Sequence, residues 1–144
     1  MEMNATTIIK APAETVFAYV IDFSNDVHWR AGAPESGLLS DEPFGLGSTG
    51  YTRAGDMESE WRVVSYVEHE SAEWELTSGP FLGSGGYQLE VIDGGTRFTL
   101  LSDVEPAGVY KLLGPLFGWM GQRRNQADVE KLREILESAQ DQVS

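Results

Sequence analysis

The chain has 144 residues, a formal net charge of −13 at pH 7 and no cysteine. Disulfides, zinc–thiolate sites, iron–sulfur clusters and cysteine nucleophiles are therefore excluded. Acidic and basic residues balance in residues 111–144, so the excess negative charge lies in the preceding part. A body this acidic repels phosphate backbones, which argues against nucleic acid as a partner. Without an apolar run of about 18 residues or a basic-plus-apolar leader, we expect a cytoplasmic protein with no stable membrane insertion.

The N-terminal segment predicts a strand followed by two short helices. Residues 4–10 contain adjacent β-branched side chains, which favour extended structure. Pro12 suits the first turn of a helix. The apolar face of that helix follows at helical spacing: Val16, Phe17, Val20 and Ile21. Residues 22–25 give a turn and capping signal, and a second short helix is expected to end near Trp29.

Six strands are expected next, as short runs separated by turn residues. They cover residues 36–40, 49–54, 57–67, 71–78, 87–91 and 96–104. Gly55-Asp56 and Asp93-Gly94-Gly95 are hairpin signals, so consecutive strands are expected to pair antiparallel. The run Gly83-Ser84-Gly85-Gly86 has no lysine or helix after it and is not a phosphate-binding loop. We interpret it as a flexible loop.

A long helical segment is expected at the C-terminal end. Residues 107–113 have a helical pattern, and Pro115 predicts a kink or a restart. The helix carries a broad apolar stripe: Leu116, Phe117, Met120, Ala127, Val129, Leu132, Ile135 and Leu136. Gly114, Gly118 and Gly121 fit either a mobile gate at a cavity mouth or close packing against the sheet. One long helix lying across a curved antiparallel sheet is an α+β architecture.

Several motifs resemble the START/Bet v 1-like (SRPBCC) superfamily, and within it the polyketide cyclase/dehydrase and lipid-transport branch. The opening Ile9-Lys10-Ala11-Pro12-Ala13-Glu14-Thr15-Val16-Phe17-Ala18-Tyr19-Val20-Ile21-Asp22 is similar to the start of that superfamily. The other similar motifs are Trp29, Gly45-Leu46-Gly47-Ser48, Gly94-Gly95-Thr96-Arg97-Phe98-Thr99-Leu100, Pro115 and Leu132-Arg133-Glu134-Ile135-Leu136-Glu137. Together they cover nearly the whole chain.

The resemblance implies a helix-grip fold, with residues 1–144 forming a single ligand-binding domain. In this fold a seven-stranded antiparallel sheet wraps around the long C-terminal helix, and two short helices lie between the first and second strands. The resemblance also implies a cavity between sheet and helix that holds a hydrophobic or amphipathic small molecule, lipid-, polyketide- or sterol-like. We expect a monomer, or a homodimer formed through an exposed edge strand, with no cofactor.

Aromatic and apolar residues on the predicted strands and helices are candidate walls of that cavity. The inner face of such a fold is both core and cavity wall, so the same residues fit core packing and ligand contact. The ligand-binding candidates are Trp29, Tyr51, Trp61, Trp74, Tyr87, Phe98, Leu116, Trp119 and Met120.

The sequence offers no complete set of residues for acid–base or nucleophilic catalysis, which favours a binding protein over an enzyme. His28 and His69 are far apart and no metal-binding motif is present, so no metal site is expected. His28 fits either a general base near the cavity mouth or a surface histidine.

Four residues are candidates if the cavity is catalytic: His28, Tyr51, Arg53 and Tyr87. Arg53 shares a strand face with Tyr51 and would suit a ligand carboxylate or enolate. Pairing with Glu60 across the Gly55-Asp56 hairpin is the expected arrangement for Arg53.

Three functional classes stay open at this point. The first is a binding protein for a hydrophobic small molecule. The second is an aromatase/cyclase or dehydratase that promotes aldol closure and water loss without metal or cofactor. The third is a protein-interaction module, as in chaperone-activating or toxin-like relatives. Buried, hydrogen-bonded polar groups in the cavity would favour the enzyme, and a large exposed apolar patch would favour the interaction module.

Overall fold

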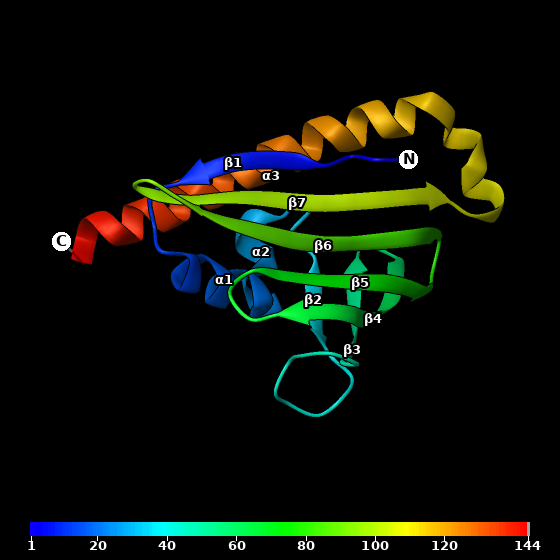
Figure 1. The fold of residues 1–144 in the computed structure, drawn as a ribbon. Helices are drawn as coiled ribbons and strands as arrows, with labels where there is room; N and C mark the ends of the chain where they lie inside the picture. Colours follow the sequence, from blue (N-terminus) through cyan, green and yellow to red (C-terminus); the bar gives the residue numbers. More distant parts are fainter. Residues whose placement is uncertain (144) are drawn as a thin grey trace.

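The computed structural model describes residues 1–143, which form seven strands and a series of helical segments (Figure 1). The first half contains β1 (Ala5–Ile9), α1 (Ala13–Ile21), η1 (Phe23–Asn25), α2 (Asp26–Trp29), β2 (Glu35–Leu38), β3 (Thr49–Ala54) and β4 (Met57–Val67). The second half contains β5 (Ser71–Ser78), β6 (Phe81–Ile92), β7 (Gly95–Pro106), η2 (Gly108–Leu113) and α3 (Gly114–Val143). No helix in this described part is long and apolar enough to cross a membrane.

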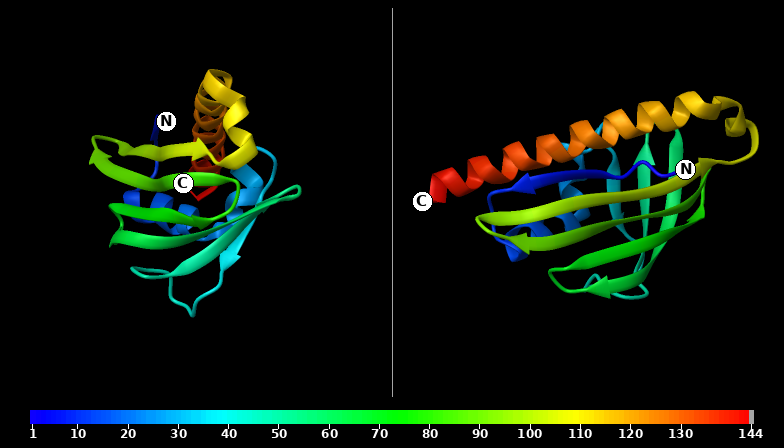
Figure 2. Two further views of the ribbon diagram at one scale, coloured as in Figure 1. Left: turned by 90° about the vertical axis from the view of Figure 1, so that its right-hand side faces the viewer. Right: turned by 45° about the horizontal axis from the view of Figure 1, so that its top comes forward.

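The seven strands form one antiparallel sheet in the order β1-β7-β6-β5-β4-β3-β2. The sheet curls, and α3 lies across its concave side (Figure 2). The short helices α1 and α2 connect β1 to β2 (Figure 1). The predicted helix-grip fold is therefore confirmed, including the two short helices between the first and second strands.

Three strands begin and end where the sequence predicted them: Thr49–Ala54, Met57–Val67 and Ser71–Ser78. β6 is different, because it begins at Phe81 and includes the glycine-rich run that we expected to be a flexible loop. That prediction was wrong. A Cβ atom on Gly85 would lie 2.9 Å from Trp74 Nε1, so the missing side chain makes room for an indole ring on the neighbouring strand.

The register of the β3–β4 hairpin corrects the predicted partner of Arg53. Arg53 lies opposite Glu58, whereas Glu60 lies opposite Tyr51. The Arg53 guanidinium forms ion pairs with Glu35 (Nη1 to Oε2, 3.2 Å) and with Glu58 (Nη2 to Oε1, 3.5 Å). Arg53 therefore belongs to an exposed charge cluster at the end of β2 and β3.

The C-terminal helical segment restarts at Pro115, which lies in the first turn of α3 after the separate helical segment η2. Gly118 and Gly121 of α3 are close to the N-terminal methionines. A Cβ atom on either glycine would collide with the sulfur of Met1 or Met3, respectively. Gly118 and Gly121 therefore do allow close packing, but against the N-terminal segment before β1 and not against the sheet, whereas nothing lies within 4 Å of a Cβ atom on Gly114.

The core is concentrated at the end of the sheet where α1 lies. Three fully buried residues of α1, Val16, Phe17 and Val20, belong to one cluster with the buried face of α3. The α3 members of that cluster are Val129, Leu132 and Leu136. The opposite end of the space between sheet and α3 is hollow.

Candidate ligand-binding cavity

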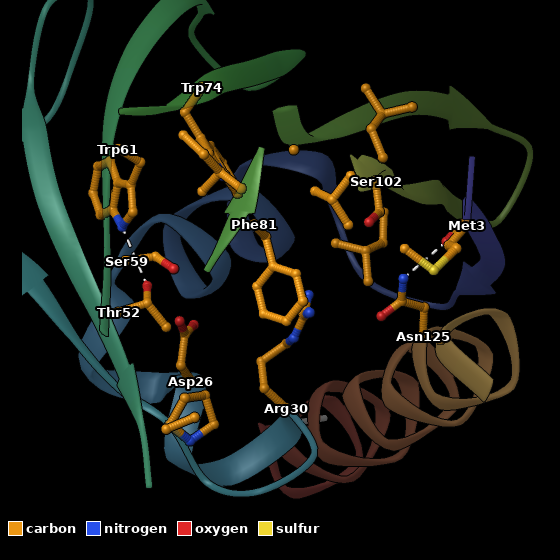
Figure 3. Close-up of a pocket in the computed structure, with 18 of the residues that line it drawn as sticks. Met3, Asp26, Arg30, Thr52, Ser59, Trp61, Trp74, Phe81, Ser102 and Asn125 are labelled. Atoms are coloured by element: carbon orange, nitrogen blue, oxygen red, sulfur yellow. Dashed lines mark hydrogen bonds between the residues drawn. The ribbon is translucent and has the colours of Figure 1, made fainter. Parts of the chain in front are cut away.

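A cavity of about 330 Å³ lies between the concave face of the sheet, α2 and the first turns of α3 (Figure 3). Its volume is within the range of small-molecule sites, about 300–1,000 Å³. Its wall is mostly apolar and includes six aromatic residues. The aromatic lining residues are Phe23, Trp61, Trp74, Phe81, Tyr87 and Phe117. Such a wall offers large apolar surfaces to a ligand.

The aromatic wall is a connected group of rings. Trp61 and Trp74 have ring centroids 6.1 Å apart, and Trp74 and Tyr87 have centroids 4.9 Å apart. These residues sit on β4, β5 and β6 at positions that face the concave side. Gly50 on β3 supports the arrangement, because a Cβ atom there would collide with the Trp61 ring and lie 2.6 Å from the Gly37 carbonyl oxygen. Glycines thus leave the space that the indole rings occupy.

Asp26 is the buried carboxylate of the cavity. It begins α2, lines the cavity and is only 7% exposed. Burial raises its pKa to about 6, although a hydrogen bond from Ser36 and the charge of Arg30 oppose this shift. Asp26 therefore changes its charge close to neutral pH.

A chain of hydrogen bonds leads across the sheet to this carboxylate. Trp61 Nε1 donates to Thr52 Oγ1 at 3.2 Å, and Thr52 Oγ1 lies 3.0 Å from Ser36 Oγ. Ser36 in turn bonds the Asp26 side chain. An ionised carboxylate only accepts, so Ser36 donates to Asp26 and the Thr52 hydroxyl donates to Ser36. Among the described residues, Asp26 Oδ1 has no hydrogen-bond partner.

Arg30 lines the same cavity one helical turn after Asp26. Its Nε atom lies 3.3 Å from Asp128 Oδ2 on α3, and its guanidinium is 5.2 Å from the centre of the Trp29 ring. Asp128 also accepts the backbone N–H of Ala31 at 3.0 Å. Burial raises the pKa of Asp128, and the nearby Arg30 opposes the shift. These contacts fasten the segment after α2 to α3.

Three predicted ligand-binding residues come together in the cavity wall: Trp61, Trp74 and Tyr87. Trp29 and Phe98 are buried in the core next to Tyr87, with ring centroids 6.1 and 5.5 Å from it. Tyr51 lies outside the lining, where its hydroxyl donates to Glu35 Oε1 at 3.0 Å. Tyr51 and Arg53 thus share the exposed charge cluster rather than the cavity.

The predicted α3 contacts lie on the outer side of the helix. Leu116, Trp119 and Met120 are exposed and are not part of the cavity lining. Phe117, Gly121 and Arg124 line the cavity instead, at the spacing of one helix face. The outer residues continue an exposed apolar surface from Leu112 of η2, and Arg123 stacks on Trp119 at 5.0 Å.

Sequence reasoning missed the polar group of the cavity, and His28 is a further candidate that lies outside it. His28 is exposed on α2 and lies outside the lining, whereas its neighbours Asp26 and Arg30 line it. Four residues of helix give too little periodicity to assign faces. Ser36 and Thr52 form their hydrogen bond because they are register partners in the β2–β3 pair, which required knowledge of the pairing.

Comparison with known proteins gives the family. A family model described as polyketide cyclase/dehydrase and lipid transport matches residues 1–137. No curated protein sequence matches the chain.

Among solved structures, TTHA0849 from Thermus thermophilus has a TM-score of 0.76 at 18% identity, covering 96% of this chain and 99% of its own. A START superfamily protein from Mycobacterium smegmatis has a TM-score of 0.70 at 19% identity, covering 99% of both chains. Ara h 8.0201 has a TM-score of 0.69 at 13% identity, covering 96% of this chain and 98% of its own. At these identities the structures establish a shared fold, and the family match establishes membership. The chain belongs to the polyketide cyclase/dehydrase and lipid transport family, with a START/Bet v 1-like helix-grip fold.

Proposed function

We propose that the protein binds a hydrophobic or amphipathic small molecule, lipid-, polyketide- or sterol-like, in the cavity between the sheet and α3. One observation carries the proposal: a space of about 330 Å³ has a mostly apolar wall to which six aromatic residues contribute. Apolar surface left open to water in this way is unfavourable, and a ligand that covers it gains the free energy of that burial. Family membership supports the same function.

The proposal is tested by filling the cavity from one strand of the sheet. Ser102 of β7 lines the cavity (Figure 3), and Thr99 lies on the opposite face of the same strand, where it contacts Thr6. We expect Ser102→Phe to abolish calorimetric binding of β-naphthol, an apolar two-ring probe, and Thr99→Phe to preserve it. Equal binding by both variants, or no binding by the unmodified protein, would overturn the proposal.

A second candidate, a polyketide aromatase/cyclase or dehydratase, is favoured by Asp26 and Arg30 lining the cavity together. In such a reaction Asp26 takes a proton from a carbon between two carbonyl groups, and the C–H electron pair moves onto the carbonyl oxygen beside Arg30. The enolate carbon then bonds to a second carbonyl carbon, whose oxygen receives the proton from Asp26. The product is an aldol.

The catalytic alternative has its own test. A poly-β-keto thioester analogue incubated with the protein should form a cyclised product, detected by chromatography and mass spectrometry. Asp26→Asn should abolish the acceleration over buffer, while Asp41→Asn on an exposed loop should retain it. If the protein binds the analogue without accelerating cyclisation, it acts as a binding protein on this substrate.

A further inference from the structure

One carboxylate oxygen of Asp26 receives no hydrogen bond, which indicates the kind of ligand group that the cavity would accept. More than nine-tenths of the Asp26 surface is buried, and the carboxyl group points into the cavity (Figure 3). One side of the carboxyl receives the hydrogen-bond chain from Ser36, while Oδ1 receives no bond from any described residue. A buried acceptor without a partner is costly, so a ligand with a hydrogen-bond donor at this point relieves that cost.

The charges around Asp26 restrict the donor further. Arg30 on the same helix lowers the pKa of Asp26, and Asp22 before η1 raises it. Asp26 in turn raises the pKa values of Tyr19 of α1 and Tyr87 of β6. Asp26 itself repels an anionic ligand. Arg30 and Arg124, which line the same cavity, repel a cation. Arg30 is already paired with Asp128, and Arg124 also lies within the field of Asp128, so acidic and basic side chains balance here and the arrangement favours a neutral donor.

We infer that Asp26 is the polar anchor of the cavity and selects apolar ligands that carry a neutral hydroxyl group, such as an alcohol or a phenol. The hydroxyl donates to the Asp26 carboxylate, and its own lone pairs remain available to a donor such as Arg30. The apolar skeleton lies against Trp61, Trp74 and Tyr87. This inference rests on the proposed ligand-binding function and adds the ligand class to it.

Three probes with the same ring system test the inference by calorimetry near neutral pH. β-Naphthol donates a hydrogen bond, its methyl ether does not, and β-naphthoate is an anion. We expect β-naphthol to bind about tenfold or more tightly than the methyl ether, as a hydrogen bond to a charged group implies. The naphthoate should bind most weakly.

Substitutions test whether the preference for β-naphthol over its methyl ether depends on Asp26. In Asp26→Leu the advantage of β-naphthol over its methyl ether should disappear, while the matched control Asp41→Leu on an exposed loop should keep it. Asp26→Asn is a second variant with nearly the same shape, and it should reduce the advantage. If the unmodified protein binds both probes equally, or Asp26→Leu keeps the preference, the inference is wrong and ligand binding stands. If no probe binds, the proposed function itself fails.

A measurement on the unmodified protein keeps the test independent of folding in the variants. Carbon NMR titration of the Asp26 carboxyl should start from a pKa of about 6. Binding of β-naphthol should lower this pKa, because the hydroxyl stabilises the carboxylate, whereas the methyl ether should raise it by removing water. A rise of the pKa with β-naphthol would contradict the inference.

Discussion

The two halves of α3 face the same sheet, but one half packs into the core and the other lines the cavity. In the C-terminal half, Val129 and Leu132 are completely buried against the core. In the N-terminal half, Phe117 is only partly buried at the edge of the cavity, while Trp119 and Met120 face outward. One continuous helix therefore forms a dry core at one end and a cavity wall at the other.

The difference arises from what lies beneath the helix. At the packed end, α1 fills the curl of the sheet with Phe17 and its neighbours. At the hollow end, the sheet supplies large rings that contact one another along its concave face, and the N-terminal Met1 and Met3 lie against Gly118 and Gly121. In this chain the cavity therefore lies at the end of the sheet that α1 does not fill.

The largest expected effect lies at the packed end. Leu132→Ala should lower the free energy of unfolding by about 3 kcal/mol, because a fully buried leucine leaves a void that the surrounding core cannot close. Denaturant unfolding measures the change, with exposed Lys131→Ala as the control. A loss below about 1 kcal/mol would mean that this end is not the dry core we describe.

The next largest effect is a gain in stability at the hollow end. The pKa of Asp26 is raised from 3.8 to about 6 in the folded protein, so its carboxyl binds a proton more readily when folded than when unfolded. Its contribution therefore becomes less favourable as pH rises between these values, and the penalty is complete above them. Asp26→Asn should raise the unfolding free energy by roughly 2 kcal/mol at about pH 8.

The control for this pH effect is Asp41→Asn, which should leave the pH dependence unchanged. Unfolding free energies measured from about pH 4 to pH 8 should show a decline that is flatter in Asp26→Asn than in the unmodified protein. Identical pH profiles for the two would contradict the burial of a charged Asp26.

A smaller loss of stability is expected for Phe117→Ala. Phe117 is half-buried beside an existing cavity and stacks on Phe81 at 5.4 Å, so its removal should cost about 1 kcal/mol. The same variant should weaken β-naphthol binding, which Leu132→Ala should not. Leu116→Ala, one position away and exposed, is the control. Equal effects of the two substitutions on binding would remove the distinction between the two sides of α3.

The smallest effect concerns the two glycines at which α3 packs closely against the N-terminal segment. Alanine favours a helix at both positions, but its Cβ meets an exposed methionine at Gly118 and a buried one at Gly121. Met1 can move aside, whereas Met3 cannot do so freely. Gly121→Ala should therefore be less stable than Gly118→Ala by about 1 kcal/mol in thermal unfolding. The reverse order would show that Met3 is not fixed against the helix.

Much of the fold could be predicted from the sequence because its hairpins are local. The turn at Gly55-Asp56 joins β3 to β4, and the turn at Asp93-Gly94 fixes the pairing of β6 with β7. The start of β6 could not be predicted in the same way. Its glycines are typical of a loop in the sequence, and only the structure shows that Gly85 leaves room for the Trp74 ring.

The candidate site was only partly predictable. Trp61, Trp74 and Tyr87 could be predicted because they are large aromatic residues on predicted strands, where core and cavity wall coincide. Leu116, Trp119 and Met120 are exposed although they are apolar, so their residue type wrongly suggested that they face the cavity. The bond between Ser36 and Thr52 joins two separate strands, and only the register brings these two side chains together.

Native mass spectrometry of the protein purified from its own host, followed by denaturing extraction, shows whether the cavity at the hollow end of the sheet holds a ligand. We expect the intact mass to exceed the chain mass by that of one small apolar molecule, which the extraction releases. Thr99→Phe should retain this molecule, and Ser102→Phe, which fills the cavity, should lose it. The unmodified protein carrying no molecule, or Ser102→Phe carrying the same one, would contradict the claim that the hollow end of the sheet is a ligand site.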